Sequence, residues 1–191
     1  MRFGRVKRPW YMDVASVHPS SMASGELTTA RAVVTDEFAR RGRLLVGLAM
    51  RLGLSVDDAT DLVQEAHLRL WRELRAGADI RDPDAWITRV VYRLAMDEHR
   101  LRRRVRMLVG RLTRPATPDP DPASALDGLA LWQAVDRLPP HERAAIYLRY
   151  QMDLPFEAIA PILDMTPGAA RTSVSRGLAR LRAREGGPSD D

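Results

Sequence analysis

The chain has 191 residues, 45% hydrophobic and 29% charged, a balance typical of a globular protein with one domain or two small ones. Its formal net charge of +5 favours a polyanionic partner such as nucleic acid, and the lack of cysteine excludes disulfides, thiolate nucleophiles and cysteine-based zinc sites. No apolar run approaches the roughly 20 residues of a membrane span, and no signal peptide is visible, so we expect a cytoplasmic protein.

The N-terminal part of the chain divides into an irregular stretch and a helix. Residues 1–29 mix basic, aromatic and serine residues without sustained periodicity, so we expect a disordered extension. A helical pattern of apolar residues follows over residues 30–52. Gly53 stands where a glycine C-cap would end this first predicted helix.

The second predicted helix extends over residues 55–76. Ser55 and Asp58 are spaced as a capping box with aspartate in place of glutamate, and an apolar stripe centred on Val63 and Leu70 indicates the buried side. The other faces are polar. Their side chains include Asp57, Asp61, Gln64, Glu65 and Arg69. Such a polar surface is ordinarily solvated, so by itself it does not predict a binding site.

The third predicted helix starts with Asp82 as N-cap and Pro83 in the first turn. One side is apolar and is expected to face the core, with Ile87, Val90, Val91, Leu94, Leu101, Val105 and Leu108. An adjoining side is basic and starts with an aromatic residue, with Trp86, Arg89, Arg93, Arg100 and Arg104. Arginines combined with an aromatic side chain are typical of surfaces that bind and stack single strands, although a tryptophan so placed is more often part of a core.

A proline-rich segment then separates two regions of the chain. Residues 113–125 contain four prolines among aspartate and alanine, a composition that predicts an extended linker. Beyond it, residues 126–185 show four helical patterns, and residues 186–191 are expected to form a disordered tail. The predicted fold class is therefore all-α, with two small helical domains at residues 30–112 and 126–185.

The last two helical patterns, over residues 154–182, indicate a helix-turn-helix. Asp164 and Met165 form the predicted corner, and Thr166 and Pro167 then supply an N-cap and a first-turn proline. The second helix has an apolar stripe of Ala170, Val174, Leu178 and Leu181, which we expect to pack inward. The side chains placed to face a DNA groove are Arg171, Thr172, Ser175 and Arg176. A solvated amphipathic helix would have the same pattern.

Signals for enzyme chemistry are weak. The chain lacks a glycine-rich dinucleotide motif and a phosphate-binding loop, and His18, His67, His99 and His141 lack the spacing of a helical zinc site. We therefore expect no catalytic residues, no metal site and no cofactor, and we expect each histidine to be structural or exposed.

Three stretches together resemble a bacterial sigma factor of the sigma-70 family, in the extracytoplasmic-function (ECF) group. They are DDATDLVQEAHLRLWRE at residues 57–73, DPDAWITRVVYRLAMDEHRLRRR at residues 82–104, and the helix-turn-helix with its preceding LPPHERAAIYLRYQMD at residues 138–182. Their order is more specific than any one motif. Asp164 departs from the glycine usual at this turn, and Ser173 departs from a frequent arginine.

The resemblance implies a role for each segment. Asp57, Asp61, Gln64 and Glu65 correspond to the surface that docks on the clamp helices of core RNA polymerase, and the resemblance also implies contact with the polymerase flap. Asp79, Ile80 and Arg81, followed by the face from Trp86 to Arg104, correspond to the part that captures an unpaired minus-ten base and holds the melted strand. Arg171, Thr172, Ser175 and Arg176 correspond to the readers of the minus-thirty-five element.

Two functions are therefore compared. The first is a promoter-specificity subunit that binds core polymerase and promoter DNA, is monomeric when free, and forms a heterodimer if an anti-sigma factor exists. The alternative is a stand-alone helix-turn-helix regulator of duplex DNA, which explains only the C-terminal half of the chain.

Overall fold

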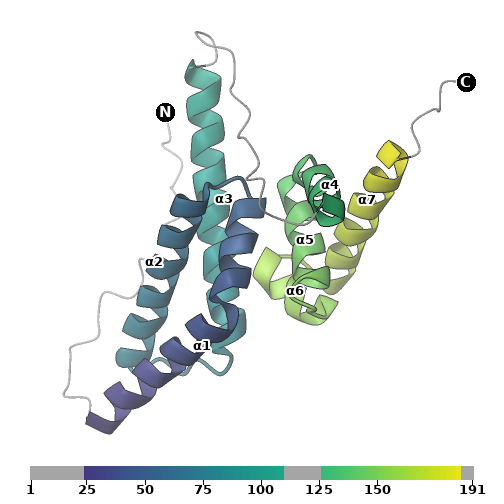
Figure 1. Ribbon diagram of the computed structural model, residues 1–191. Coiled ribbons are helices and arrows are strands. Elements are labelled where there is room, and N and C mark those ends of the chain that lie inside the picture. Colours follow the sequence, from purple (N-terminus) through teal and green to yellow (C-terminus); the bar gives the residue numbers. More distant parts are fainter. Residues whose placement is uncertain (1–23, 110–125, 186–191) are drawn as a thin grey trace, which may run out of the picture.

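The computed structural model describes residues 24–109 and 126–185, and these ranges are helical without strands (Figure 1). This confirms the predicted all-α class. The helices are α1 (Ser24–Arg51), α2 (Val56–Arg75), α3 (Pro83–Val109), α4 (Leu126–Asp136), α5 (Pro140–Tyr150), α6 (Phe156–Leu163) and α7 (Pro167–Glu185). The predicted linker and tail, and residues 1–23 of the predicted extension, lie outside the described residues.

Helix α1 begins earlier than expected. The disordered extension was predicted to reach residue 29, whereas the helix starts at Ser24. The prediction is therefore wrong for residues 24–29. No proline interrupts these residues, and a helix that is already nucleated can extend backwards at little cost. At the other end, Gly53 has φ +96°, which confirms the predicted glycine after the helix.

The predicted N-caps of three helices are present. The Asp58 N–H donates to Ser55 Oγ at 3.2 Å, the Ala85 N–H to Asp82 Oδ1 at 2.9 Å, and the Ala169 N–H to Thr166 Oγ1 at 3.2 Å. Each bond satisfies a donor that the first turn of a helix leaves without an intrahelical partner. These local signals fix where α2, α3 and α7 begin.

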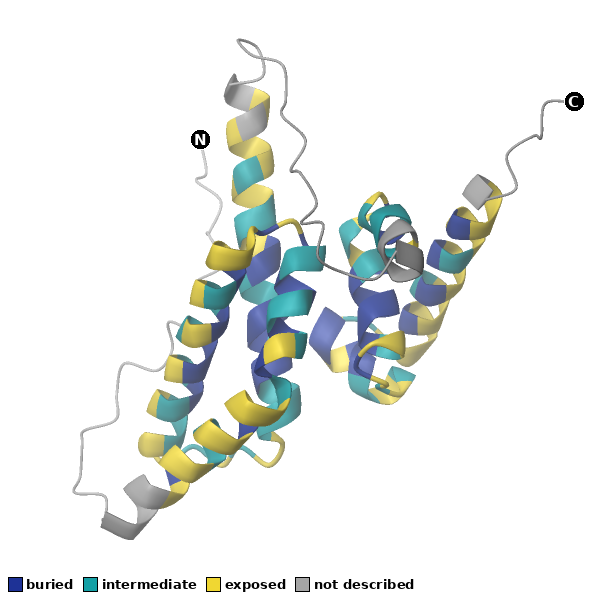
Figure 2. Cartoon of the chain, viewed as in Figure 1, coloured by how far each residue is buried: buried dark blue, intermediate teal, exposed yellow. Residues whose placement is uncertain are grey.

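Helices α1, α2 and α3 form an N-terminal body whose core contains Leu48, Val63, Leu70 and Val91, all fully or nearly fully buried. The apolar stripe predicted for α3 is wrong in its C-terminal part, because Leu101 and Val105 are about half exposed. This end of α3 extends past α1 and α2, and exposed residues recur along it in Figure 2. Its apolar residues therefore lack a helix to pack against.

Helices α4 to α7 form a C-terminal body in which α7 packs on α5 and α6 (Figure 1). The predicted stripe of α7 is confirmed, since Ala170, Val174 and Leu181 are buried and Leu178 is partly buried. One contact was not predicted: a Cβ at Gly177 would lie 2.7 Å from Cδ1 of Ile146 in α5. Glycine at this position allows α7 to approach α5 closely.

The two bodies are in contact. Buried residues of α1 and α3, including Leu48 and Val91, belong to the same apolar cluster as Leu148 of α5 and Ile159 of α6. The chain therefore has two helical domains that share a continuous packed interface in this structure.

Asp84, in the first turn of α3, connects α3 to α1. Its carboxylate accepts hydrogen bonds from Arg40 at 3.0 and 3.3 Å and lies 3.1 Å from Nη1 of Arg41. Burial alone would raise the pKa of Asp84, but the hydrogen bonds and charges of the two arginines outweigh burial and lower it. The charged carboxylate is therefore the form that the folded state favours.

Replacing Asp84 with asparagine is expected to lower the free energy of unfolding by about 1 kcal/mol at pH 7. A carboxyl with a lowered folded pKa adds stability above its unfolded pKa, and this contribution is lost as pH falls through the folded pKa. The gap between wild type and Asp84→Asn should therefore begin to narrow below about pH 4 and close only below the lowered folded pKa. Urea unfolding at several pH values measures this gap. Asp97→Asn is the control, because Asp97 pairs with Arg100 of its own helix; an equal pH-dependent gap there would contradict the assignment to Asp84.

Candidate functional site

The turn between α6 and α7 has the geometry of a helix-turn-helix corner. Asp164 ends α6 with φ 58° and ψ 48°, a left-handed conformation, and its N–H donates to the Ala160 carbonyl. Asp164, which stands where the family usually has glycine, thus takes a conformation that glycine adopts most readily and that aspartate tolerates better than most residues. The turn places the start of α7 against α6.

All four side chains predicted to read duplex DNA lie on the exposed side of α7. Arg171, Thr172, Ser175 and Arg176 are exposed, whereas Val174 between them is buried. The Arg171 guanidinium lies over the Phe156 ring at 5.2 Å, and the Thr172 hydroxyl donates to the Gly168 carbonyl at 2.9 Å. The structure thus brings the four residues onto one surface, as their spacing predicted.

Arg180 is a further basic residue of α7, but it differs from these four residues. Its Nη1 donates to both carboxylate oxygens of the buried Glu142 of α5 at 2.8 Å. Charged hydrogen bonds of this kind hold two helices together. Arg180 therefore fixes α7 on α5 and does not point freely toward a ligand.

Replacing Arg176 with alanine is expected to weaken promoter binding by roughly 1 to 3 kcal/mol and to relax one base preference, if its guanidinium contacts a base edge. Arg182→Ala is the control, because Arg182 is also exposed on α7 but lies farther from the helix start. The affinity of the assembled polymerase for single-base variants of the promoter, measured with each substitution, gives the loss of affinity and the change in base preference. A loss at Arg176 that is equal on every sequence would instead make it a phosphate contact.

The loop before α3 and the basic face of α3 form the second predicted site. Asp79 and Arg81 are exposed and pair at 3.6 Å, while Ile80 and Trp86 are partly buried and pack against the core. At the projecting end of α3, Arg104 is exposed. The structure therefore separates the loop charges, which face solvent, from two apolar residues that also support the fold.

Arg89 and Arg93 lie on the side of α3 that faces α6. The Nη2 atoms of both arginines are 3.9 Å from Oδ1 of Asp164, while Arg100 pairs with Asp97 at 3.1 Å. Burial lowers the pKa of Arg93, the neighbouring Arg89 lowers it further, and Asp164 acts in the opposite direction. Two adjacent, partly buried guanidinium groups form a site suited to an anion.

The predicted docking residues lie along α2, but they are not equivalent. Asp57, Asp61 and Gln64 are exposed, whereas Glu65 is partly buried and accepts a hydrogen bond from Arg69 Nε at 2.8 Å. Glu65 also lies 3.8 Å from Arg72 Nη1. Its charge is therefore already paired within α2.

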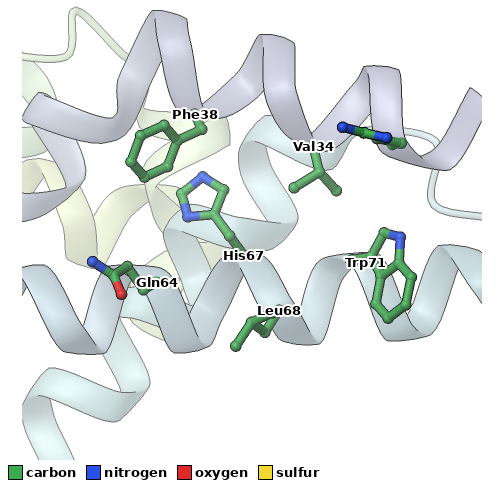
Figure 3. Close-up of a pocket in the computed structure, with 7 residues that line it drawn as sticks. Val34, Phe38, Gln64, His67, Leu68 and Trp71 are labelled. Atoms are coloured by element: carbon green, nitrogen blue, oxygen red, sulfur yellow. The ribbon is translucent and has the colours of Figure 1, made fainter.

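An apolar groove between α1 and α2 adjoins these residues (Figure 3). Sequence reasoning missed it, because its two walls come from helices about thirty positions apart. The lining residues are Arg31, Val34, Phe38, Gln64, His67, Leu68 and Trp71. Phe38 and Leu68 are about half exposed and line the same groove, and adjoining exposed apolar side chains are typical of an interaction surface.

The buried residues His67 and Glu37 contact each other, and His67 also lines the groove. His67 Nδ1 lies 2.7 Å from the Val63 carbonyl, and because a carbonyl only accepts, this nitrogen must be the donor. Its Nε2 contacts the buried Glu37 carboxyl, and the Phe38 ring meets the imidazole edge-on at 4.9 Å. These contacts hold the Phe38 and His67 rings in place, and they give His67 the structural role expected from the sequence.

Within the described ranges, no three histidine, aspartate or glutamate side chains gather in a way that could hold a metal ion. In the same ranges, none of the helices combines the length and the apolar character that crossing a bilayer requires.

Comparison with known families matches both bodies. Residues 37–105 match the model of sigma-70 region 2, and residues 128–181 match the model of sigma-70 region 4. The first range covers most of α1 to α3, with the basic face and all groove-lining residues except Arg31 and Val34. The second covers the helix-turn-helix.

Similar curated proteins include ECF RNA polymerase sigma factors. SigL of Mycobacterium tuberculosis is 30% identical over 168 residues, which cover 85% of this chain and 92% of SigL. SigE of Mycolicibacterium smegmatis is 33% identical over 141 residues, which cover 71% of this chain. The chain spans about half, 54%, of the length of SigE.

A solved structure shares the fold. The sigma factor RpoE of Bartonella quintana, in complex with the anti-sigma factor NepR, superposes with a TM-score of 0.63 over 78% of this chain and 94% of RpoE, at 24% identity. The helical architecture with region 2 and region 4 defines a sigma-70-type protein. The chain belongs to the ECF sigma factor family.

Proposed function

We propose that this chain binds core RNA polymerase and directs promoter recognition and transcription initiation. The observation that carries the proposal is the presence, in one chain, of region 2 and region 4, each with its own set of exposed polar and charged side chains. The groove between α1 and α2 and the two proposed DNA-facing surfaces lie on different helices, so polymerase and promoter would be bound at separate places on the chain. The chemistry of initiation is assigned to the polymerase, and no catalytic step is assigned to this chain.

In this proposal, polymerase docks on α2 and the adjoining groove. Asp57, Asp61 and Gln64 would supply polar contacts, and Phe38 and Leu68 would be buried by the polymerase surface. Apolar burial surrounded by polar contacts is the usual arrangement of a stable protein interface. Glu65 would contribute less than its neighbours, because it is paired with Arg69.

The loop of Asp79, Ile80 and Arg81 and the face of α3 are proposed to act on the minus-ten element. Extracting a base from the duplex costs a few kcal/mol, which stacking and arginine contacts to the freed strand must offset. Arg89 and Arg93 would contact strand phosphates. Arg171, Thr172, Ser175 and Arg176 are proposed to read the minus-thirty-five element.

A stand-alone regulator would bind duplex DNA without polymerase. Region 2, with its groove and basic face, would then have no role, which is why we favour the first function. A mobility-shift experiment separates the two: a promoter fragment should be retained with sequence specificity only when core polymerase is added. Specific retention by the protein alone, unchanged by polymerase, would support the regulator.

We also propose an anti-sigma factor as a partner. The similar RpoE structure is a complex with an anti-sigma factor, and the exposed apolar residues of the groove offer a surface for such a protein. The chain would then be a monomer when free or a heterodimer with that partner, and would act in the cytoplasm with the polymerase.

A further inference from the structure

The aromatic ring of Phe156 contacts two arginine side chains. Phe156 is the first residue of α6, a helix that packs on both α5 and α7. The guanidinium carbon of Arg171, in α7, lies 5.2 Å from the centre of the ring, and that of Arg149, in α5, lies 5.4 Å from it. Both distances are within the roughly 6 Å over which the face of an aromatic ring attracts a cation. The ring therefore joins α7 to α5 through two cation–π contacts.

Phe156 has a fixed position on the protein. Its side chain is partly buried and packs against the apolar core. Pro155, which precedes it, has a restricted backbone, and the Leu154 carbonyl accepts a hydrogen bond from Arg149 Nη1 at 3.1 Å. Arg149 thus holds the segment before Phe156 and also contacts the ring. The ring can therefore act as a fixed support for the Arg171 side chain.

The contact with Phe156 leaves the N–H groups of Arg171 available. Within the part of the chain that the structure describes, the Arg171 guanidinium has neither a hydrogen bond nor an ion pair. A cation–π contact is electrostatic and occupies no hydrogen-bond donor. The guanidinium can therefore still donate to oxygen or nitrogen acceptors of DNA.

The contact also restricts the Arg171 side chain before any ligand binds. A free arginine side chain has many rotamers, and ordering it at an interface has an entropic cost. A side chain that a ring already holds loses less freedom on binding. Arg176 is also exposed on α7, but among the described residues no aromatic ring lies against it. Of the two arginines proposed to read duplex DNA, Arg171 is therefore the one that is held in advance.

We propose that Phe156 is a positioning residue for the reading of duplex DNA: its ring holds the Arg171 guanidinium in place for a hydrogen-bond acceptor of the minus-thirty-five element. The inference rests on the proposed function, because it requires that α7 meets DNA. The acceptor is a phosphate oxygen or a guanine edge, since a guanidinium binds both through paired N–H groups. In this role Phe156 acts through Arg171 and does not itself read a base.

The affinity of polymerase assembled with this chain for a promoter duplex tests the role of Phe156. Phe156→Leu keeps an apolar side chain but removes the ring, and it is expected to weaken binding by about twofold to thirtyfold, the range of a cation–π contact. Phe156→Tyr keeps an aromatic face and should bind nearly as tightly as the wild type. Single-base variants of the duplex distinguish the two acceptors. Loss of a phosphate contact lowers the affinity for all variants equally, whereas loss of a guanine contact lowers it only where that base is present.

A double-mutant cycle shows whether Phe156 acts through Arg171. In the Arg171→Ala background, Phe156→Leu should have little further effect on the affinity for DNA, whereas in the Arg176→Ala background it should keep its full effect. Arg176 is the matched control, because it is an exposed arginine of the same helix. Equal effects in the two backgrounds would show that the ring acts only through the general structure of region 4, and would overturn the proposal.

Nuclear magnetic resonance of the free protein separates this inference from the proposed function. The ring should shift the Arg171 Nε–H signal in the wild type and in Phe156→Tyr, and the shift should be lost in Phe156→Leu. The Arg176 signal should not change. Absence of the shift in the wild type overturns the proposal even if the promoter is bound. If the shift is present but polymerase with this chain binds no promoter, the ring still holds Arg171, and the proposed function fails together with the DNA-binding part of this inference.

Discussion

Replacing Leu68 with glutamate is expected to weaken association with core polymerase by about tenfold to a hundredfold, an effect typical of a residue at the centre of an interface. Leu68 is 48% exposed and lines the groove beside Phe38 and Trp71. A carboxylate there would lose its hydration on docking without gaining a partner. Because the side chain is already half exposed in the free protein, the unfolding temperature should change little. Titration of labelled protein with core polymerase, without DNA, measures the affinity.

Leu101→Glu is the control for this substitution. Leu101 is 53% exposed, but it lies in the C-terminal part of α3, which does not line the groove. Its substitution should leave the affinity for polymerase unchanged in the absence of DNA. If both glutamates weaken association equally, the groove is not the docking surface.

Gly177→Ala is expected to lower the free energy of unfolding by about 1 to 3 kcal/mol, the usual cost of overpacking a core. The new methyl carbon would lie 2.7 Å from Cδ1 of Ile146, which is itself buried between α5 and α7. Alanine favours a helix over glycine by roughly 1 kcal/mol, so the steric cost must exceed this gain. Urea unfolding of the purified chain measures the difference.

Two further variants test the cause. Gly168 also lies in α7, but a Cβ there would meet nothing within 4 Å. Gly168→Ala should therefore be neutral or stabilising by up to about 1 kcal/mol. Ile146→Val removes the Cδ1 atom that Gly177→Ala would contact, and the double variant should regain most of the lost stability. No recovery would show that the loss has another origin than this contact.

Features that depend on neighbouring residues in the sequence could be predicted. The caps at Ser55, Asp82 and Thr166 need only a side-chain oxygen close to the first free N–H groups. The left-handed conformation of Asp164 follows from the position of a corner between two helical patterns. The four exposed residues of α7 follow from the period of a helix and the inward direction of Val174.

Features that depend on a distant helix could not be predicted. The periodicity of α3 indicates an apolar side but not where the neighbouring helices stop, so Leu101 was wrongly expected in the core. Gly47 and Gly177 look like ordinary helix interruptions until Tyr147 and Ile146 are seen against them. The contact of Glu37 with His67 joins two helices, and no local pattern indicates it.

Run-off transcription with purified core polymerase tests the central claim most directly. On a library of promoter fragments, adding this protein should produce transcripts that start at defined positions and that core polymerase alone does not make. Arg176→Ala should reduce them and Leu68→Glu should nearly abolish them. If the wild-type protein leaves the transcripts of core polymerase unchanged on every fragment, this chain is not a promoter-specificity subunit.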